Sequence, residues 1–405
     1  MRSAPGRVGM ATADPISDVI SATPQPAASL LVMLAAMPAD QFEGVLANLA
    51  SAFAADSLLI AAQNELASTS FPDLRIVSAP PTSAAWTSTA ADFVNAFQFA
   101  QQEGVRAILM LGPGSGSLSP ASLRELAGAV LNSTVDLAVP CYTLPPHAGL
   151  INSAILYPLT RALFATRVRF PQAIDLGLSL RMAERLAATA QRFTSTNQTD
   201  ALIWPVNEAI AAGLTTDEYE VGTRALPQPA DTDINAILSL VTGSLFADIE
   251  TKAAIWQRPR RLPPPRRSMP DRQLADGTAE VARMIESFRF AYSNLQEIWS
   301  LVLPPNSLLG LKRLSVADPA EFRMPEALWA RIVFDFLIAY RLRTINRGHL
   351  LGALIPLYLA WVAGHINITA AGTSSERHIE AVAAAFEADK PYMVSRWRWP
   401  DRFNS

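Results

Sequence analysis

A glycine-rich stretch in the first third of the chain is the first place where residue types and spacing suggest chemistry. The stretch "LGPGSGSLSP" occupies residues 111–120 and follows "VRAILM", an apolar run typical of a buried strand. Open α/β sheets bind ligands at the carboxyl ends of their strands, and successive backbone N–H groups at Gly112, Gly114 and Ser115 could cradle a phosphate. The stretch lacks the lysine and the spacing of a P-loop. A phosphate loop and a tight strand-to-helix turn without a ligand both remain open, and we expect the turn.

One acid and three arginines further along the chain carry charge that a reaction could use. Asp175 lies between two apolar residues, so we expect partial burial, which would suit this carboxylate to acid–base catalysis. Buried carboxylates are usually paired, so the alternative is that Asp175 caps a helix or pairs with one of the arginines. Guanidinium groups bind planar oxyanions, and Arg161, Arg167 and Arg169 could therefore bind an anionic substrate. A structural set of ion pairs is the interpretation that we favour for them.

Two further residues are candidates for substrate binding. Tyr142 ends the strand-like run at 135–142, and His147 follows in the loop "LPPHAGL". A loop histidine is more often exposed than catalytic. The other histidines have no metal-ligand spacing to one another, so we predict no metal ligands among them: His349, His365 and His378.

The elements that position these residues follow from the hydrophobic periodicity. Up to about residue 235, short apolar runs alternate with segments of helical spacing, which predicts a mixed, mostly parallel sheet with helices on both faces. Long helical patterns follow. The expected strands are 29–36, 56–63, 74–79, 106–112 and 135–142, and the expected helices before residue 135 are 40–54, 89–104 and 119–132.

Four parts of the chain are predicted. Residues 1–26 form a flexible polar extension, 27–250 an α/β domain, 251–270 an Arg/Pro-rich loop, and 271–405 a helical C-terminal region. The loop contains "RPRRLPPPRRSMP" at 258–270, and prolines at this density exclude a helix.

Composition excludes several classes of function. The 405 residues carry a net charge of −3, which argues against a general nucleic-acid binder. Cys141 stands alone, so no disulfide framework or Cys-based zinc site is predicted. The first residues lack the apolar core of a secretory signal, which favours a cytoplasmic location. The apolar segment 350–364 is short for a membrane span and contains Pro356, so we expect a buried helix there.

A central block of the sequence resembles a known family. The segment "NSAILYPLTRALFATRVRFPQAIDLGLS" at 152–179 is similar to GT-A glycosyltransferases related to glucosyl-3-phosphoglycerate synthase and mannosylglycerate synthase, and more closely to a bacterial glycosyl transferase family 2 branch. That branch carries YPLTRALYG, then R-V-R-x-P, then G-G-D-F-G. This chain has "YPLTRAL" at 157–163, "RVRFP" at 167–171 and "AIDLG" at 173–177.

The resemblance implies a GT-A-like, Rossmann-like domain and an activity. The activity would be transfer of a hexose from a nucleotide sugar to a small polar acceptor such as a glycerate. In such enzymes the acid at the position of Asp175 sits beside the sugar or acceptor, which makes it the candidate catalytic residue. The remaining roles would be a nucleotide-sugar loop of Gly112, Gly114 and Ser115, and substrate binding by Arg161, Arg167, Arg169, His147 and Tyr142.

The family's metal site is missing from this sequence. Its Asp-X-Asp carboxylates hold Mg²⁺ or Mn²⁺ on the sugar diphosphate, because the leaving phosphates need a hard cation. Here "SLSP" at 117–120 matches the helix start that follows, which places Gly112, Pro113 and Gly114 on the Asp-X-Asp positions. The family's L-G-x-K-x-H histidine maps to Leu226 in "VGTRAL". We therefore expect no metal and no cofactor.

Three functions remain open. The first is a metal-independent hexosyltransferase, with the three arginines supplying charge and Asp175 orienting the sugar or acceptor. The second is a catalytically inactive homologue that binds a ligand or acts as a scaffold, as a homodimer or beside an active paralogue. The third is a membrane-associated transferase that uses a lipid-linked donor, suggested by the apolar segment 350–364 and the basic segment 258–267.

Overall fold

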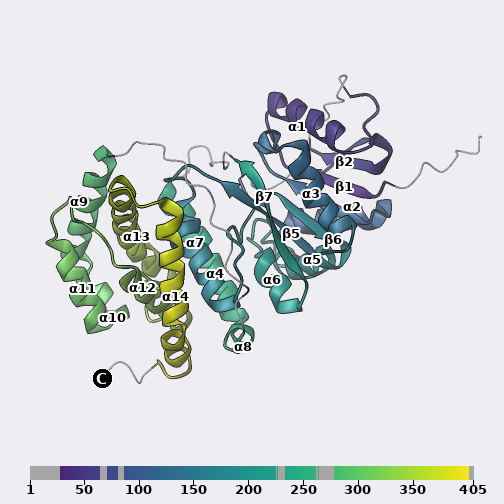
Figure 1. The fold of residues 1–405 in the computed structure, drawn as a ribbon. Coiled ribbons are helices and arrows are strands. Elements are labelled where there is room, and N and C mark those ends of the chain that lie inside the picture. Colours follow the sequence, from purple (N-terminus) through teal and green to yellow (C-terminus); the bar gives the residue numbers. More distant parts are fainter. Residues whose placement is uncertain are drawn as a thin grey trace, which may run out of the picture.

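The structure is a computed structural model that describes residues 28–63, 71–80, 86–224, 226, 233–260, 263 and 278–400. These residues form two lobes, an α/β lobe and a helical lobe (Figure 1). Helices α4 (Tyr157–Phe164) and α7 (Ile234–Thr251) lie on the side of the helical lobe that faces the α/β lobe. The predicted extension at 1–26 and most of the Arg/Pro-rich stretch lie outside the described residues.

The α/β lobe is built on a seven-stranded sheet with the order β3-β2-β1-β4-β6-β5-β7. Strand β6 runs antiparallel to both of its neighbours, whereas the other pairs are parallel. Every residue of β2 and β4 is buried, as expected for strands covered on both faces. The strands are β1 Leu30–Leu34, β2 Leu58–Ala62, β3 Ile76–Ser78, β4 Ala107–Leu111, β5 Leu137–Thr143, β6 Leu176–Ser179 and β7 Thr216–Thr223.

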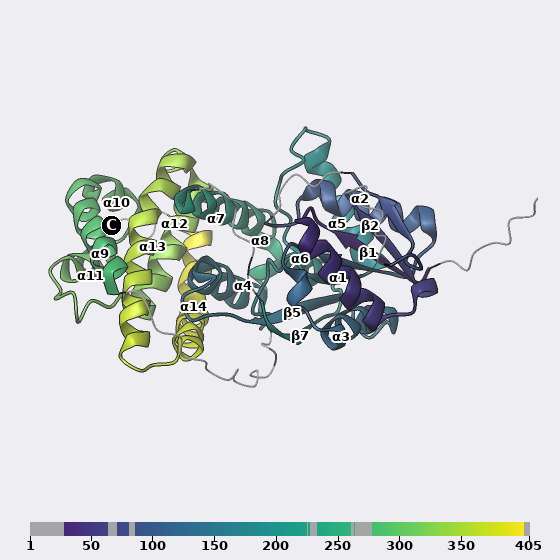
Figure 2. The same ribbon diagram turned by 90° about the horizontal axis from the view of Figure 1, so that it is seen from above.

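Helices cover both faces of this sheet, which confirms the predicted fold class. Figure 2 shows α1 and α3 on one face and α2 and α5 on the other. Local signals set the helix ends: Ser119 caps α3 with Pro120 in the first turn, and Gly104 ends α2 with a φ of 66°. The helices of this lobe are α1 Ala39–Ala52, α2 Ala90–Glu103, α3 Pro120–Leu131, α5 Leu180–Thr194 and α6 Pro205–Ala212, with short 3₁₀ turns at Ala55–Ser57 and Ser115–Ser117.

The helical lobe has its own hydrophobic core, and this core begins earlier in the chain than residue 271. The π-helical turn Asn152–Leu156, helix α4 and helix α7 all contribute buried residues to it. The start of the predicted loop at 251–270 is helical instead, because it forms α8 (Ala253–Trp256). Trp256 packs against Trp397 there. The helices are α4 Tyr157–Phe164, α7 Ile234–Thr251, α8 Ala253–Trp256, α9 Thr278–Asn294, α10 Gln296–Val302, α11 Pro305–Ser315, α12 Glu326–Leu342, α13 Arg347–Ala370 and α14 Ser375–Arg398.

Two helices, α7 and α13, are long and apolar enough to cross a membrane by length and composition alone. Core helices of globular proteins meet the same criterion. In α13, 72% of the most apolar window is buried inside the protein, and in α7 the share is 39%. The burial of α13 agrees with the buried helix expected at 350–364.

Candidate functional site

The glycine-rich loop after β4 forms a turn whose backbone amides bond within the protein. The Gly112 N–H donates to Asp175 Oδ1 at 3.0 Å and the Gly114 N–H to Gln41 Oε1 at 3.0 Å. The Ser115 N–H donates to the Gly112 carbonyl at 3.2 Å, at the start of the 3₁₀ turn. All three candidate amides of the phosphate loop thus have internal acceptors. This is the geometry of the tight turn, and a phosphate would have to displace these acceptors.

A side chain at Gly112 would require Ile174 to move. A Cβ atom there would lie 2.2 Å from Ile174 Cδ1 and 2.4 Å from Ile174 Cγ1. The space that remains beside the ends of β1 and β4 is about 30 Å³, enough for one or two waters. The described residues that line it include Asp92 and none that is basic. The side chain of Ile174 thus fills the space next to Gly112.

Asp175 is fully buried, and four donors satisfy its two oxygens. Arg224 donates from Nε to Oδ2 at 2.9 Å and from Nη2 to Oδ1 at 3.2 Å. The Tyr142 hydroxyl donates to Oδ2 at 2.9 Å, and the Gly112 N–H completes the set. Both charged side chains of the pair are 0% exposed. The expected burial and pairing of Asp175 are present, but the partner is Arg224 rather than Arg161, Arg167 or Arg169.

One cluster connects four adjacent strands, at the edge of the sheet where β4, β5 and β7 end and β6 begins: Gly112, Tyr142, Asp175 and Arg224. The residues come from the end of β4, from β5, from the start of β6 and from the end of β7. Burial raises the pKa of Tyr142 well above its ordinary value, and the negative charge of Asp175 raises it further. The phenol therefore stays protonated and acts as a hydrogen-bond donor. We refer to these four residues below as the edge cluster.

Sequence reasoning did not single out Arg224, although a signal was present. Arg224 stands in "VGTRAL", at the position of the lysine in the family's L-G-x-K-x-H segment. Arg224 is a cation, like that lysine, and it stands two residues before Leu226. The pairing itself depends on the strand order, which brings β7 beside β5 and β5 beside β6.

The three candidate arginines do not gather around one anion site. Arg161 is buried in α4 and donates to Glu387 at 2.6 Å and to Glu380, both on α14. Arg169 is also buried, and it donates to Glu376 at the start of α14 and to the Ser153 hydroxyl, each at 3.0 Å. Arg167 donates instead to the Pro263 carbonyl at 2.8 Å. The favoured interpretation, a structural set of ion pairs, describes the geometry of Arg161 and Arg169, which attach α4 and the loop after it to α14.

His147 belongs to a histidine cluster that sequence spacing could not reveal. Its Nε2 lies 3.1 Å from the Thr369 hydroxyl, and its ring lies 6.2 Å from that of His365. His365 and His378 form a hydrogen bond between their Nδ1 atoms, which are 2.7 Å apart. Burial lowers the pKa of His365 to about 3, and the adjacent His378 contributes to the decrease. Among the residues that the structure describes, no group of three or more His, Cys, Asp or Glu could hold a metal ion.

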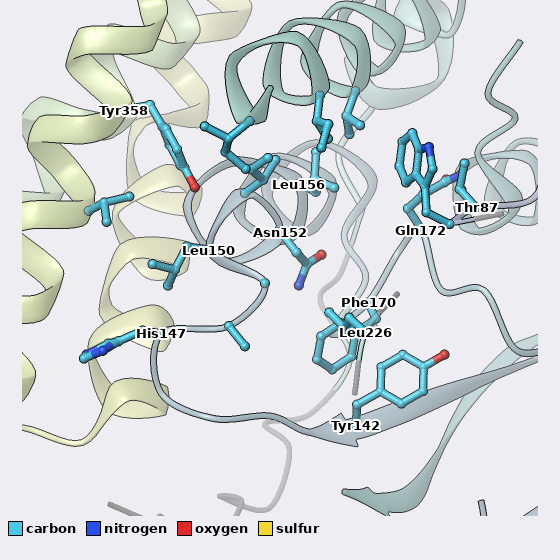
Figure 3. A pocket seen from close by; sticks show the side chains of 18 of the residues that line it. Thr87, Tyr142, His147, Leu150, Asn152, Leu156, Phe170, Gln172, Leu226 and Tyr358 are labelled. Carbon is cyan, nitrogen blue, oxygen red and sulfur yellow. The ribbon is translucent and has the colours of Figure 1, made fainter. Parts of the chain in front are cut away.

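A cavity of about 480 Å³ lies between the two lobes, next to the edge cluster. Its wall is formed by Tyr142 of β5, the loop and π-helical turn at 147–156, the loop at 170–174, and helices α7, α9 and α13. Figure 3 shows Tyr358, Asn152, Gln172 and Phe170 around it. The volume falls in the range of small-molecule sites, roughly 300–1,000 Å³. This cavity lies at the ends of the strands where the edge cluster stands, and it could receive a ligand.

Similarity to known proteins was found at the level of structure. No protein-family model matches the sequence, and no curated protein matches it significantly. Crystal structures of glucosyl-3-phosphoglycerate synthase from Mycobacterium tuberculosis are similar. The complex with phosphoglyceric acid has 13% sequence identity, with a TM-score of 0.35 over 55% of this chain and 80% of its own. The complex with Mn²⁺, UDP-glucose and phosphoglyceric acid has 13% identity, with a TM-score of 0.36 over 55% of this chain and 79% of its own. Superpositions of this extent assign no activity to the chain.

Proposed function

We propose that this chain is a glycosyltransferase-like protein that no longer transfers sugar and that acts by binding a ligand or a protein partner. One observation carries the proposal. Ile174 fills the space at Gly112, where the sequence resemblance places the first carboxylate of Asp-X-Asp. A divalent cation on a sugar diphosphate needs oxygen ligands at that position, and the position offers an apolar side chain instead.

The cations that could replace the metal are engaged elsewhere. A departing nucleoside diphosphate needs substantial stabilisation of its negative charge, from a metal, from guanidinium groups or from oriented amides. Arg161 and Arg169 bind carboxylates of α14, and Arg224 neutralises Asp175. The amides of the glycine-rich loop bond within the protein. Each of these bonds would have to break before its donor could reach a phosphate.

The candidate catalytic residue is also unsuited to proton transfer in this arrangement. Both oxygens of Asp175 accept hydrogen bonds from fully or largely buried donors, and its side chain has no exposed surface. A general base must lie within hydrogen-bond reach of the proton that it removes. In this geometry Asp175 stabilises the edge of the sheet, and an acceptor hydroxyl could reach it only after Tyr142 or Arg224 moved away.

Titration with nucleotide sugars tests the proposal. The full-length protein would be titrated calorimetrically with UDP-, GDP- and ADP-linked glucose and mannose, each with Mg²⁺, Mn²⁺ or EDTA. Release of nucleoside diphosphate would be followed with glycerate and 3-phosphoglycerate as acceptors. We expect no saturable binding and no release above the protein-free rate, from a sample whose thermal unfolding is cooperative. Metal-dependent binding with release of the diphosphate would overturn the proposal and establish the hexosyltransferase.

An Ile174→Ala variant tests whether the Ile174 side chain is what prevents nucleotide-sugar binding. If the wild-type protein binds no nucleotide sugar while the variant does, Ile174 is the obstacle. If neither binds, the loss of carboxylates and of free cations suffices without it.

A further inference from the structure

The cavity between the lobes is built from elements that are distant in the sequence. Tyr142 and Phe170 come from the α/β lobe, Ile237 from α7, Met284 from α9 and Tyr358 from α13. Both lobes therefore contribute to one cavity of about 480 Å³ that is partly open to solvent. A space of this kind between two packed units is a common location for small-molecule sites.

The wall of the cavity is mostly apolar and carries almost no charge. Aliphatic and aromatic side chains from α7, α9 and α13 form one side, and Trp86, Phe170 and Ile174 lie on the other. Of the described residues that line it, Glu280 is the only Asp or Glu, and none is Arg or Lys. A ligand with phosphate or carboxylate groups would lose its hydration there without gaining a cation.

Polar atoms at the wall are few and separate. Figure 3 shows Tyr358 and Gln172 on either side of the apolar space, with the Tyr358 hydroxyl turned toward it. Burial raises the pKa of Tyr358 well above its ordinary value, so this phenol stays neutral. Gln172 donates from Nε2 to the Thr87 hydroxyl at 3.4 Å, and its Oε1 is buried with no hydrogen-bond partner in the described structure. That acceptor has almost no exposed surface, so the Tyr358 hydroxyl is the polar group that a ligand hydroxyl would meet.

We propose that this cavity binds an uncharged amphiphile, a mostly apolar small molecule that carries a hydroxyl group. Its apolar body contacts the side chains of α7, α9 and α13. Its hydroxyl bonds with the Tyr358 phenol. The inference rests on the proposed function as a binding protein, and it specifies the chemical class of the ligand.

Displacement of a neutral fluorescent probe tests the ligand class. Nile red would be bound to the full-length protein and displaced by 1-decanol, decanoate and decylamine, which share a chain and differ in head-group charge. We expect saturable Nile red binding, with decanol displacing the probe at a concentration at least about tenfold lower than decanoate. Equal or better displacement by decanoate, or no saturable probe binding, would overturn the proposal.

Two substitutions on the same helix locate the site. Met284 lines the cavity, whereas Phe290 is 74% exposed on α9. Met284→Trp fills the space and should weaken Nile red binding at least about tenfold, because overpacked sites do not expand freely. Phe290→Trp introduces the same indole outside the cavity and should leave Nile red binding unchanged. If Met284→Trp does not fold, Leu359→Trp on α13 replaces it. Equal binding by the filling and control variants would place the probe elsewhere and refute the site.

Tyr358→Phe tests the polar contact, since it removes one hydroxyl and keeps the ring. We expect decanol to bind about three- to tenfold more weakly, the effect of one net hydrogen bond, with Nile red affinity little changed. Failure of this inference and failure of the proposed function are distinguishable. Transfer from a nucleotide sugar would refute the proposed function, whereas absence of alcohol binding in a protein that also ignores nucleotide sugars refutes only the ligand class.

Discussion

Replacing Arg224 by methionine tests the interpretation of Asp175 as part of a structural cluster. The substitution removes two charge-assisted hydrogen bonds, of 2.9 and 3.2 Å, and leaves the Asp175 carboxylate buried with the Tyr142 hydroxyl and the Gly112 N–H. Breaking a buried ion pair by removing one partner lowers the free energy of unfolding by about 3–5 kcal/mol. Since two donors remain on the carboxylate, we expect a loss of about 3–4 kcal/mol for Arg224→Met.

A double-mutant cycle makes this prediction specific. Asp175→Asn alone should cost a similar amount, because it leaves the Arg224 guanidinium buried without a counter-charge. The double variant Asp175→Asn/Arg224→Met should cost clearly less than the two single losses added, with a coupling energy of about 2 kcal/mol or more. Urea unfolding followed by circular dichroism and by tryptophan fluorescence would measure all four proteins, with coincident transitions as the check on two-state behaviour.

A matched surface substitution serves as the control. Arg181 also pairs with an aspartate, Asp136, but the Arg181 side chain is 74% exposed. Asp136 keeps the Thr215 and Ser179 hydroxyls as partners. Arg181→Met should therefore cost about 1 kcal/mol or less. The structural role would be refuted if each single variant, at Asp175 or at Arg224, lost less than about 1 kcal/mol of unfolding free energy and the two losses were additive in the double variant. Asp175 would then be free to act in catalysis.

Three further predictions follow from the same geometry. The unfolded chain protonates His365 near pH 6.5, whereas burial and His378 lower its pKa to about 3 in the folded state. The free energy of unfolding should therefore decrease as the pH falls from 6.5 toward 3, by up to about 1.4 kcal/mol per pH unit. Thermal melts from pH 7 to pH 4 would show a flatter decrease for His365→Asn. Gly112→Ala places a methyl group 2.2 Å from Ile174 Cδ1 and should cost about 1–3 kcal/mol in urea unfolding, with part of the loss recovered in the double variant with Ile174→Ala. Arg161→Met should cost about 3 kcal/mol, because it leaves two carboxylates of α14 without their buried partner, and limited proteolysis should then cleave near α14 first.

Much of the fold was predictable because its signals are local. The apolar runs of β1, β2 and β4 are buried on both faces, so their composition alone marks them as strands. Ser119, Pro120 and Gly104 define helix ends through their own side chains or backbone conformation. Strand β7 was not predicted, because it is a polar edge strand, "TDEYEVGT", in which only Val221 is buried. Strand β6 has four residues, too few for a clear alternation.

The candidate site was predictable only where one residue determines its own surroundings. The burial of Asp175 follows from its apolar neighbours, and the absence of a metal ligand at Gly112 follows from the residue type. The identity of the partner does not, because Arg224 is 49 residues from Asp175 and meets it only through the strand order. The cluster of His147, His365 and His378 likewise depends on how α13 and α14 pack against the loop after β5.

Ile174 connects the two conclusions about this edge of the sheet. Its side chain lines the small space at Gly112 and also the large cavity between the lobes, so it forms part of the partition between them. On one side it excludes the carboxylate and the metal that a sugar diphosphate requires; on the other it adds apolar surface to a wall that already lacks cations among its described residues. If both proposals hold, loss of transfer chemistry and the apolar character of the cavity follow from the same packing. A substitution of Ile174 should therefore change both the space at Gly112 and the binding of apolar ligands in the cavity. If the two features were unrelated, the substitution would change only one of them.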